Sequence, residues 1–473
     1  LNILGGIIMD LFQIVNSINS VLWGPVMLFF LLGTGVLFTW KLRFLQVRKL
    51  GQAFKETFGG IFKKSDAADE DGMSSFQALS TAIAAQVGTG NLAGVATAIA
   101  AGGPGAIFWM WISGFFGMGT IFAEAVLAQI YKTRVDGEVT GGPAYYIRDG
   151  LKNKYLAGFF SVAIVLALGF MGNMVQSNSI SQAVTGAFDV PAVGVGIFVA
   201  IIVGLIIMGG IGRIAKFTEM VVPFMAAFYI LGSLVIVFMN FENIVPAFQM
   251  IIYGAFNPMA ATGGLIGATV KESFRYGIAR GLFSNEAGMG STPHAHAVAK
   301  VKHPGKQGLV AIMGVVIDTG IVCTLTALVI LTTGALGTGL SGAALTQQGF
   351  VNGFGGFGSI FIAICLFFFA LSTIIGWYFF GESNIRYLFG KKGIGLYRVI
   401  VLFCIVFGTT MEVELVWELA DTFNGLMVIP NLIALLGMSS LIIKATNDFE
   451  DNFEKGKPSS FENKEKGISK NIS

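Results

Sequence analysis

The most constraining feature of this sequence is a series of apolar runs, each about 20 residues long. A helix of that length crosses the roughly 30 Å hydrocarbon core of a bilayer. Only 12% of the residues are charged, whereas soluble domains carry about 25%. We therefore predict an all-α membrane protein with eleven transmembrane helices, at 21–40, 74–100, 105–131, 157–187, 191–209, 217–239, 276–298 (with an apolar lead-in from 258), 308–334, 357–381, 395–411 and 415–443.

Two further segments flank these predicted spans. Residues 1–20 are predicted to form a short amphipathic lead-in, before the first span at 21–40. Residues 444–473 are rich in Lys, Glu, Asn and Ser, so we expect a disordered polar tail. The cysteines all lie in apolar runs, which favours packed thiols over a disulfide framework; they are Cys323, Cys365 and Cys404.

The basic residues predict the orientation of the chain in the membrane. All but three of the 30 Lys and Arg residues fall in the connections on one side; the exceptions are Lys271, Arg275 and Arg280. Cytoplasmic loops carry the excess of positive charge, so this side is predicted to face the cytoplasm. An odd number of spans then leaves the N-terminus outside and the C-terminus inside, in a multi-pass protein of the cell membrane.

The span at 74–100 contains an interruption, "QVGTGNLAG" at 86–94. Two glycines disfavour helix by about 1 kcal/mol each relative to alanine, and Thr and Asn offer competing hydrogen bonds. One interpretation is close helix packing through Gly88 and Gly90. The other is a binding site, because irregular backbone in a membrane is tolerated only where it lines a cavity or is buried in protein.

A second interruption favours the binding site. "SNEAGMGSTPHAHA" at 284–297 repeats the Gly-x-Gly pattern as Gly288 and Gly290 and adds Pro293. Each interruption opens a block of five spans, over 74–239 and 258–443. Because five is odd, the two blocks insert with opposite orientations. Paired breaks in two inverted halves are typical of the central site of a transporter.

Interrupted helices expose carbonyl groups at one end of the gap and amide groups at the other. These ends attract cations and anions respectively, so the gap suits a zwitterion and a small hard cation. The sequence shows no nucleophile–base pair, zinc spacing or phosphate loop. We expect no enzyme activity, no organic cofactor and no nucleic-acid partner; the expected partners are a small neutral amino acid and the lipid bilayer, with no obligate protein partner evident.

The ninth predicted span offers two hydroxyl groups for such a cation. Ser372 and Thr373 are adjacent in an apolar helix, although hydroxyls there commonly bond to their own preceding turn. Trp377 lies one turn beyond Thr373 on the same face. Phe283 and Asn285 lead into the second interruption. The fourth span carries amides as well, but interhelical bonds are at least as good an explanation for them; they are Asn173, Gln176 and Asn178.

Ionisable residues inside spans are costly and mark candidate functional groups. Glu286 touches the second interruption and is predicted to pair with Arg280 or Lys271. Structural ion pairs are the favoured role for the other acids, which are Glu124, Asp318 and Asp421. His294 and His296 are not expected to bind metal together, because positions two apart do not share a helix face.

Several long motifs resemble one family. "GGPGAIFWMWISGFFG" at 102–117 resembles the signature of the alanine/glycine:cation symporters, also called sodium:alanine symporters. The resemblance covers nearly the whole chain. It extends through "VGTGNLAGVA" at 87–96, "GGPAYYI" at 141–147, "ARGLFSNEAGMGS" at 279–291 and "ADTFNGLMVIPNLIAL" at 420–435.

This resemblance implies a LeuT-type inverted repeat of five plus five helices, preceded by one extra N-terminal helix. It implies symport of alanine or glycine with Na⁺ by alternating access, with H⁺ or glutamine used by some members. By position, the Na⁺ ligands would be Ala84, Val87, Phe369, Ser372 and Thr373. The amino-acid contacts would be Gln86, Thr89, Gly90, Asn91, Phe283, Asn285 and Trp377. An amino-acid channel or facilitator and a non-transporting sensor remain as alternatives.

Overall fold

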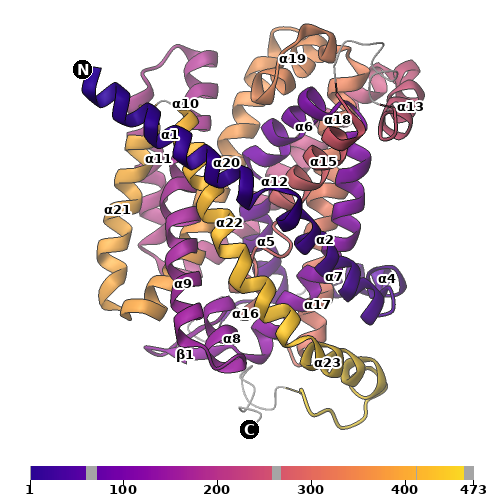
Figure 1. Ribbon diagram of the computed structural model, residues 1–473, viewed down its shortest axis with the longest axis vertical. Helices are drawn as coiled ribbons and strands as arrows, with labels where there is room; N and C mark the ends of the chain where they lie inside the picture. Colours follow the sequence, from indigo (N-terminus) through magenta and orange to yellow (C-terminus); the bar gives the residue numbers. More distant parts are fainter. Residues whose placement is uncertain (1, 60–71, 258–267, 412, 463–473) are drawn as a thin grey trace.

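The computed structural model describes residues 2–59, 72–257, 268–411 and 413–462 (Figure 1). Its regular elements are helices, apart from one antiparallel ribbon of β1 (Thr133–Val135) and β2 (Glu138–Thr140) and one isolated bridge between Met73 and Ala299. The predicted apolar lead-in at 258–267 and the end of the predicted tail, 463–473, lie outside the described residues.

Seven helical stretches of the described chain are long and apolar enough to cross a membrane. They are Phe12–Lys41, Ala106–Ile130 (α7), Lys154–Phe188 (α9, η2 and α10), Gly210–Met239 (α12), Pro304–Thr332 (α17, η4 and α18), Phe357–Phe389 (α20) and Val416–Gly437 in α22 (Val413–Gly437). An eighth would be the pair Ser75–Gln86 (α5) and Gly90–Gly102 (η1 and α6), which is bent by 52°.

This number is lower than the eleven spans predicted, and the reason is local. Three predicted spans correspond to helices that are short or interrupted. They are α11 (Ala192–Ile207), α15 (Val270–Asn285) followed by α16 (Pro293–Ala297), and α21 (Lys392–Gly408). A criterion of helix length and apolar composition therefore finds the continuous spans, but it does not find these three, because their helices are too short or are interrupted.

Several of the remaining α-helices are parts of the stretches above, and the others lie in the connections between them. The α-helices are α1 (Asn2–Leu22), α2 (Pro25–Lys41), α3 (Leu45–Arg48), α4 (Leu50–Phe58), α6 (Val95–Gly102), α8 (Pro143–Gly150), α9 (Lys154–Ile164), α10 (Asn173–Phe188), α13 (Ile244–Gly254), α17 (Pro304–Val315), α18 (Thr324–Thr332), α19 (Gly342–Phe354) and α23 (Ser439–Asp451). Short 3₁₀ turns are η3 (Phe241–Asn243), η5 (Ala335–Thr338) and η6 (Phe453–Lys455). The π-helical segments are η1 (Gly90–Gly94), η2 (Val165–Gly172) and η4 (Val316–Cys323).

Both interrupted helices begin with the same local motif. α5 starts at a capping box in which the Ser74 hydroxyl accepts from the Gln77 amide, and the Gln77 side chain accepts from the Ser74 amide. α15 starts at an equivalent box formed by Thr269 and Glu272. Because each box satisfies two free amide groups, it fixes where the helix begins. The two breaks therefore follow well-defined helix starts.

The connections sort to the two ends of the molecule. In Figure 1, α4, β1, α8 and α23 lie at the lower end, whereas α13 and α19 lie at the upper end. The lower connections include basic residues such as Lys55, Arg134 and Arg148. The connections that the basic residues assigned to one side of the membrane thus lie together at the lower end of the molecule.

The segment predicted as a short lead-in, 1–20, corresponds to α1 (Asn2–Leu22), and the apolar stretch that can cross a membrane begins within this helix, at Phe12. The prediction for the tail needs correction. The tail is not disordered at its start, because α23 continues to Asp451. Phe449 is buried, and the His303 ring lies 3.2 Å from the Asp448 carboxylate. These contacts hold α23 against the start of α17.

The end of α1 is hydrogen-bonded to α22. The Asn19 amide donates to the backbone oxygen (2.7 Å) and the carboxylate (2.5 Å) of Glu418. The side-chain oxygen of Asn19 accepts from the Thr422 hydroxyl at 2.7 Å. Trp23 adds a bond from its indole nitrogen to the Asp421 carbonyl at 2.9 Å. Since Asn19 is buried, these bonds fix α1 onto α22.

We expect Asn19→Ala to destabilise the protein by about 1–3 kcal/mol, because it removes three hydrogen bonds that join α1 to α22. Ser17→Ala is a matched control, since the Ser17 hydroxyl is exposed and bonds within its own helix. Thermal unfolding in detergent measures the difference. Equal midpoints for the two variants would mean that α1 is not held by Asn19.

Candidate functional site

The first predicted interruption is present in the structure. α5 ends at Gln86, and Val87 is extended, with φ −86° and ψ 94°. Gly88 donates its amide to the Asn91 side chain at 2.9 Å, and the π-helix η1 begins at Gly90. The chain therefore leaves the α-helical hydrogen-bond pattern at the glycines, as their positions predicted.

Five oxygen atoms from two helices converge at this break. The Thr373 hydroxyl lies 3.0 Å from the Ala84 carbonyl, 3.3 Å from the Val87 carbonyl and 2.9 Å from the Phe369 carbonyl. The Ser372 hydroxyl lies 2.9 Å from the Phe369 carbonyl and 3.4 Å from the Ala84 carbonyl. All five residues are fully buried. We call these atoms the five-oxygen cluster.

Gly88 permits this approach of the two helices. A Cβ atom at Gly88 would lie 2.5 Å from the Thr373 hydroxyl, closer than real Cβ contacts. On the facing helix, a Cβ at Gly376 would lie 3.0 Å from the Ala85 amide. Because Gly88 and Gly376 have no side chains, the end of α5 can lie within hydrogen-bond distance of the hydroxyls of α20.

The second interruption is also present, and a carboxylate from another helix stabilises it. α15 ends at Asn285, and Glu286, Gly288 and Gly290 have positive φ of 57°, 86° and 81°. Glu124 of α7 accepts from the Gly288 amide at 3.1 Å and the Gly290 amide at 3.0 Å. The prediction of an ion pair for Glu124 is wrong. Its carboxylate binds backbone amides that the break leaves free.

Side chains connect the two interruptions to each other and to α20. Gln86 donates to the Asn285 carbonyl at 2.6 Å. The Trp377 indole donates to Glu286 at 2.8 Å. Glu286 also accepts from the Ser291 hydroxyl, so its predicted ion pair with Arg280 or Lys271 is wrong.

Gly90 lies beside α15 as well. A Cβ at Gly90 would be 3.7 Å from the Ser284 Cα and 3.8 Å from the Phe283 ring. The predicted amino-acid contacts therefore gather around one junction of the two breaks with α20.

Two further polar side chains contact the first interruption. Gln176 of α10 donates to the Thr89 hydroxyl at 3.1 Å. From the sequence, a bond between helices and a contact with the solute were both open for Gln176. Asp318 of η4 accepts from Asn91, Ser284 and Thr319, all of which are neutral. No ion pair joins Asp318 to any described residue, so its predicted ion pair is wrong.

The other polar residues singled out have structural contacts. Asn173 bonds the Gly169 carbonyl of its own helix, and Asn178 bonds the Gly408 carbonyl at the end of α21. His294 contacts the Ser291 carbonyl and the Asn384 amide, while His296 contacts Gln307. Among the described residues, no group of three or more His, Cys, Asp or Glu side chains could hold a metal ion.

Two cavities reach residues of the junction. One of about 210 Å³ is lined by Thr89 and Ala93 of the first break, with Gln182 and Gln347. The other, of about 250 Å³, has Phe283 in its wall together with charged residues of α15 and α22. Asp421 and Arg280 share this second cavity without a direct ion pair between them. A cavity thus lies beside a residue of each interruption.

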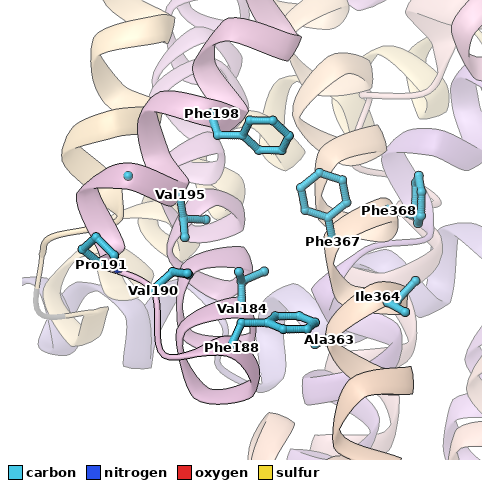
Figure 2. Close-up of a pocket in the computed structure, with 11 residues that line it drawn as sticks. Val184, Phe188, Val190, Pro191, Val195, Phe198, Ala363, Ile364, Phe367 and Phe368 are labelled. Atoms are coloured by element: carbon cyan, nitrogen blue, oxygen red, sulfur yellow. The ribbon is translucent and has the colours of Figure 1, made fainter.

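A larger pocket of about 500 Å³ is different in kind (Figure 2). It lies between α20 and the segment that joins α10 to α11, and its wall is apolar throughout. Phe198 and Phe367 lie across it from each other. It contains none of the predicted site residues and offers no polar side chain for a charged solute. We therefore exclude it as the amino-acid site.

Comparison with known proteins identifies the fold and the family. A solved manganese transporter from Eremococcus coleocola shares the fold, with a TM-score of 0.51 and 15% identity over 83% of this chain and 81% of its own. A sodium/alanine symporter, AgcS, of Methanococcus maripaludis is 47% identical, over 94% of this chain and 98% of its own.

A probable sodium/glutamine symporter, GlnT, of Bacillus subtilis is 43% identical over 94% of this chain and 92% of its own. The family model described as "Sodium:alanine symporter family" matches residues 9–463. With relatives this similar along nearly their whole length, the chain belongs to the sodium:alanine symporter family.

Proposed function

We propose that this protein imports a small neutral amino acid, alanine or glycine, by Na⁺ symport with alternating access. The observation that carries the proposal is the convergence of the five-oxygen cluster on an interrupted membrane helix. Carbonyl and hydroxyl oxygens are the ligands that hard cations prefer. The AgcS relative, named as a sodium/alanine symporter, supports the same solute and ion.

The proposed Na⁺ ligands are Ala84, Val87, Phe369, Ser372 and Thr373. Three of the oxygens are carbonyls and two are hydroxyls, so the cluster carries no formal charge. One ligand lies in α5, one directly follows α5 at Val87, and three lie in α20. A bound Na⁺ would therefore hold the first interruption against α20 and couple ion binding to the shape of the adjacent solute site.

The proposed amino-acid contacts are Gln86, Thr89, Gly90, Asn91, Phe283, Asn285 and Trp377. Free amides at the start of η1 suit a carboxylate, and carbonyls at the end of a helix suit an ammonium group. The rings of Phe283 and Trp377 would limit the size of the side chain. The name of GlnT keeps glutamine as an alternative solute. H⁺ is the alternative coupling ion, as the name of a sodium/proton-dependent alanine carrier among the relatives suggests.

We propose further that the fold is the LeuT-type inverted repeat, with eleven spans and one helix before the repeats. Support comes from the two interrupted helices, α5–η1–α6 and α15–α16, which would open halves at 74–239 and 258–443. The end with α4, α8 and α23 would face the cytoplasm, since it includes the basic connections. The N-terminus would then lie outside the cell membrane and the C-terminus inside.

Uptake of radiolabelled alanine into proteoliposomes tests the function. We expect accumulation when an inward Na⁺ gradient is the only driving force, and competition by unlabelled alanine but not by leucine. At 100 mV, one charge moved inward supports about fifty-fold accumulation. Flux that ignores both Na⁺ and pH gradients would indicate a facilitator. Binding without flux would indicate a sensor, and uptake driven only by a pH step would indicate H⁺ coupling.

Thr373→Ala should raise the Na⁺ concentration for half-maximal uptake about tenfold, because it removes a ligand worth roughly 1–2 kcal/mol. Thr373→Ser keeps the hydroxyl, so its Na⁺ concentration for half-maximal uptake should stay close to that of the parent protein. Uptake measured across a Na⁺ series gives both values. A parent-like Na⁺ dependence in Thr373→Ala would remove this hydroxyl from the cation site.

Gly88→Ala should reduce Na⁺-driven uptake strongly, because its Cβ would meet the Thr373 hydroxyl at 2.5 Å. Gly94→Ala is the control, since a Cβ there meets nothing within 4 Å. Each substitution adds one methyl group, two residues before η1 at Gly88 and at the last residue of η1 at Gly94. The assay is initial uptake at equal amounts of reconstituted protein. Equal uptake by the two variants would contradict the close approach of α5 and α20 during transport.

A further inference from the structure

A stripe of exposed apolar side chains continues from the end of α2 into α3 and α4. Its members are Trp40, Phe44, Val47, Leu50 and Phe54, which follow one another at steps of three or four residues. Trp40 is 71% exposed, and Val47 and Phe54 are each 58% exposed. Neighbouring exposed apolar residues of this kind mark a contact surface. We call these five residues the apolar stripe.

The apolar stripe is continuous with the exposed side of a membrane span. The stretch Phe12–Lys41 is long and apolar enough to cross a membrane, and Trp40 lies at its end. Tryptophan is enriched where spans leave the hydrocarbon region. Within the same stretch, α2 exposes further large apolar side chains, which are Val26, Phe29, Phe30 and Val36. The stripe therefore extends a surface that lipid covers along α2.

The opposite face of this segment is fixed to the body of the protein. Gln46 of α3 is buried, and its amide donates to the Thr39 hydroxyl of α2 at 2.8 Å. Leu45 is buried beside it, and Ala53 and Thr57 are buried on the inner side of α4. In Figure 1, α4 lies at the edge of the molecule. The apolar stripe therefore cannot turn inward without loss of these contacts.

The five basic residues of this segment fall into two groups. The Arg48 guanidinium lies 3.0 Å from the Glu450 carboxylate, and the Lys49 ammonium lies 2.6 Å from the Glu454 carboxylate. Both of these pairs join the segment to the C-terminal part of the chain. The other three basic residues are exposed and form no ion pair with any described residue; they are Lys41, Arg43 and Lys55.

The three unpaired cations accompany the apolar stripe along the chain. Lys41 follows Trp40, Arg43 precedes Phe44, and Lys55 follows Phe54. Exposed Trp, Phe and Leu beside Lys and Arg are typical of segments that lie in the membrane interface. Phosphate groups of anionic lipids attract such basic residues next to a span. A second copy of this chain fits less well, because a symmetric contact through the stripe would bring like charges together.

We propose that the apolar stripe, together with Lys41, Arg43 and Lys55, binds anionic phospholipid. The acyl chains would lie against the stripe, and the phosphate groups would lie at the three cations. Arg48 and Lys49 stay outside this surface, because α23 and the turn that follows it already neutralise them. The inference goes beyond the proposed symport and depends neither on the solute nor on the coupling ion.

Quenching of tryptophan fluorescence by brominated lipid measures the contact. Phe54→Trp places a reporter at the far end of the stripe, in the full chain reconstituted into phosphatidylcholine vesicles. The difference from the parent protein isolates the signal of this residue. We expect brominated phosphatidylglycerol to give half-maximal quenching at a mole fraction at least about tenfold below that of brominated phosphatidylcholine.

A charge variant tests the role of the cations. Lys55→Gln, added to Phe54→Trp, should raise the mole fraction of brominated phosphatidylglycerol for half-maximal quenching about fivefold. Quenching by brominated phosphatidylcholine should not change. Lys457→Gln is the matched control, since Lys457 is exposed but no described residue after Ile433 is an exposed large apolar one. This control should behave as Phe54→Trp does with both lipids.

A second reporter is available if Phe54→Trp does not fold. Trp40 is already part of the stripe, and its signal is the difference between the parent protein and Trp40→Phe. The same preference for brominated phosphatidylglycerol is expected there, with the same loss in Lys41→Gln.

Two outcomes would overturn the proposal. Equal half-maximal mole fractions for the two lipids would mean that the stripe touches the bilayer without selecting anionic headgroups. A reporter at position 54 that neither lipid quenches would mean that the stripe is covered by protein, either a partner or a second copy. Neither outcome bears on Na⁺-driven uptake of alanine, so the proposed function is tested separately.

Discussion

The structure depends on how peptide groups are satisfied where two membrane helices are interrupted. In hydrocarbon each unpaired amide or carbonyl costs several kcal/mol, so a break persists only when other groups replace the lost bonds. Glu124 does this for the amides of Gly288 and Gly290. Asn91 does it for the amide of Gly88, and Gln86 donates to the carbonyl of Asn285. The carbonyls left at the end of α5 contact hydroxyls of α20.

The sequence predicted the interruptions because their cause is local. Gly88, Gly90, Gly288 and Gly290 weaken a helix wherever it lies, and no tertiary information is needed to recognise them. The continuous spans were equally visible, as length and apolar composition. Adjacent hydroxyls in an apolar span suggested Ser372 and Thr373 as partners of a cation at the first break, and the resemblance to a family added the carbonyls of Ala84, Val87 and Phe369. The role of these oxygens in binding an ion stays a prediction.

The buried acids were the part that sequence could not assign. An acid in an apolar span suggests an ion pair, but Glu124 binds two backbone amides and Glu286 binds the Trp377 indole. These partners depend on which amides a break leaves free and on which helix passes beside them. The start of the tail was misjudged for a similar reason, because Phe449 is buried only once α23 lies against α17. Composition alone does not contain such tertiary contacts.

Irregular backbone is concentrated around the same junction. Residues of the site come from η1 and η4, and η2 directly precedes α10, which supplies Gln176. A π-helical turn shifts the side chains that follow it relative to an α-helix, and such turns are frequent at functional sites. Asn91 and Asp318 each lie within one of these segments. Their contact joins two segments that are both released from ordinary α-helical geometry.

The bonds of Asn19 have a consequence for entry into the molecule. The cavity that includes Phe283 has part of its wall from Asn16, Asn19 and Trp23, which precede the first interrupted helix. Widening this cavity would strain the attachment of α1 to α22. If the solute of the proposed symport enters through it, α1 would affect the rate of entry without contacting the bound solute. Chains with one common solute site could diverge in speed simply by altering the helix at their beginning.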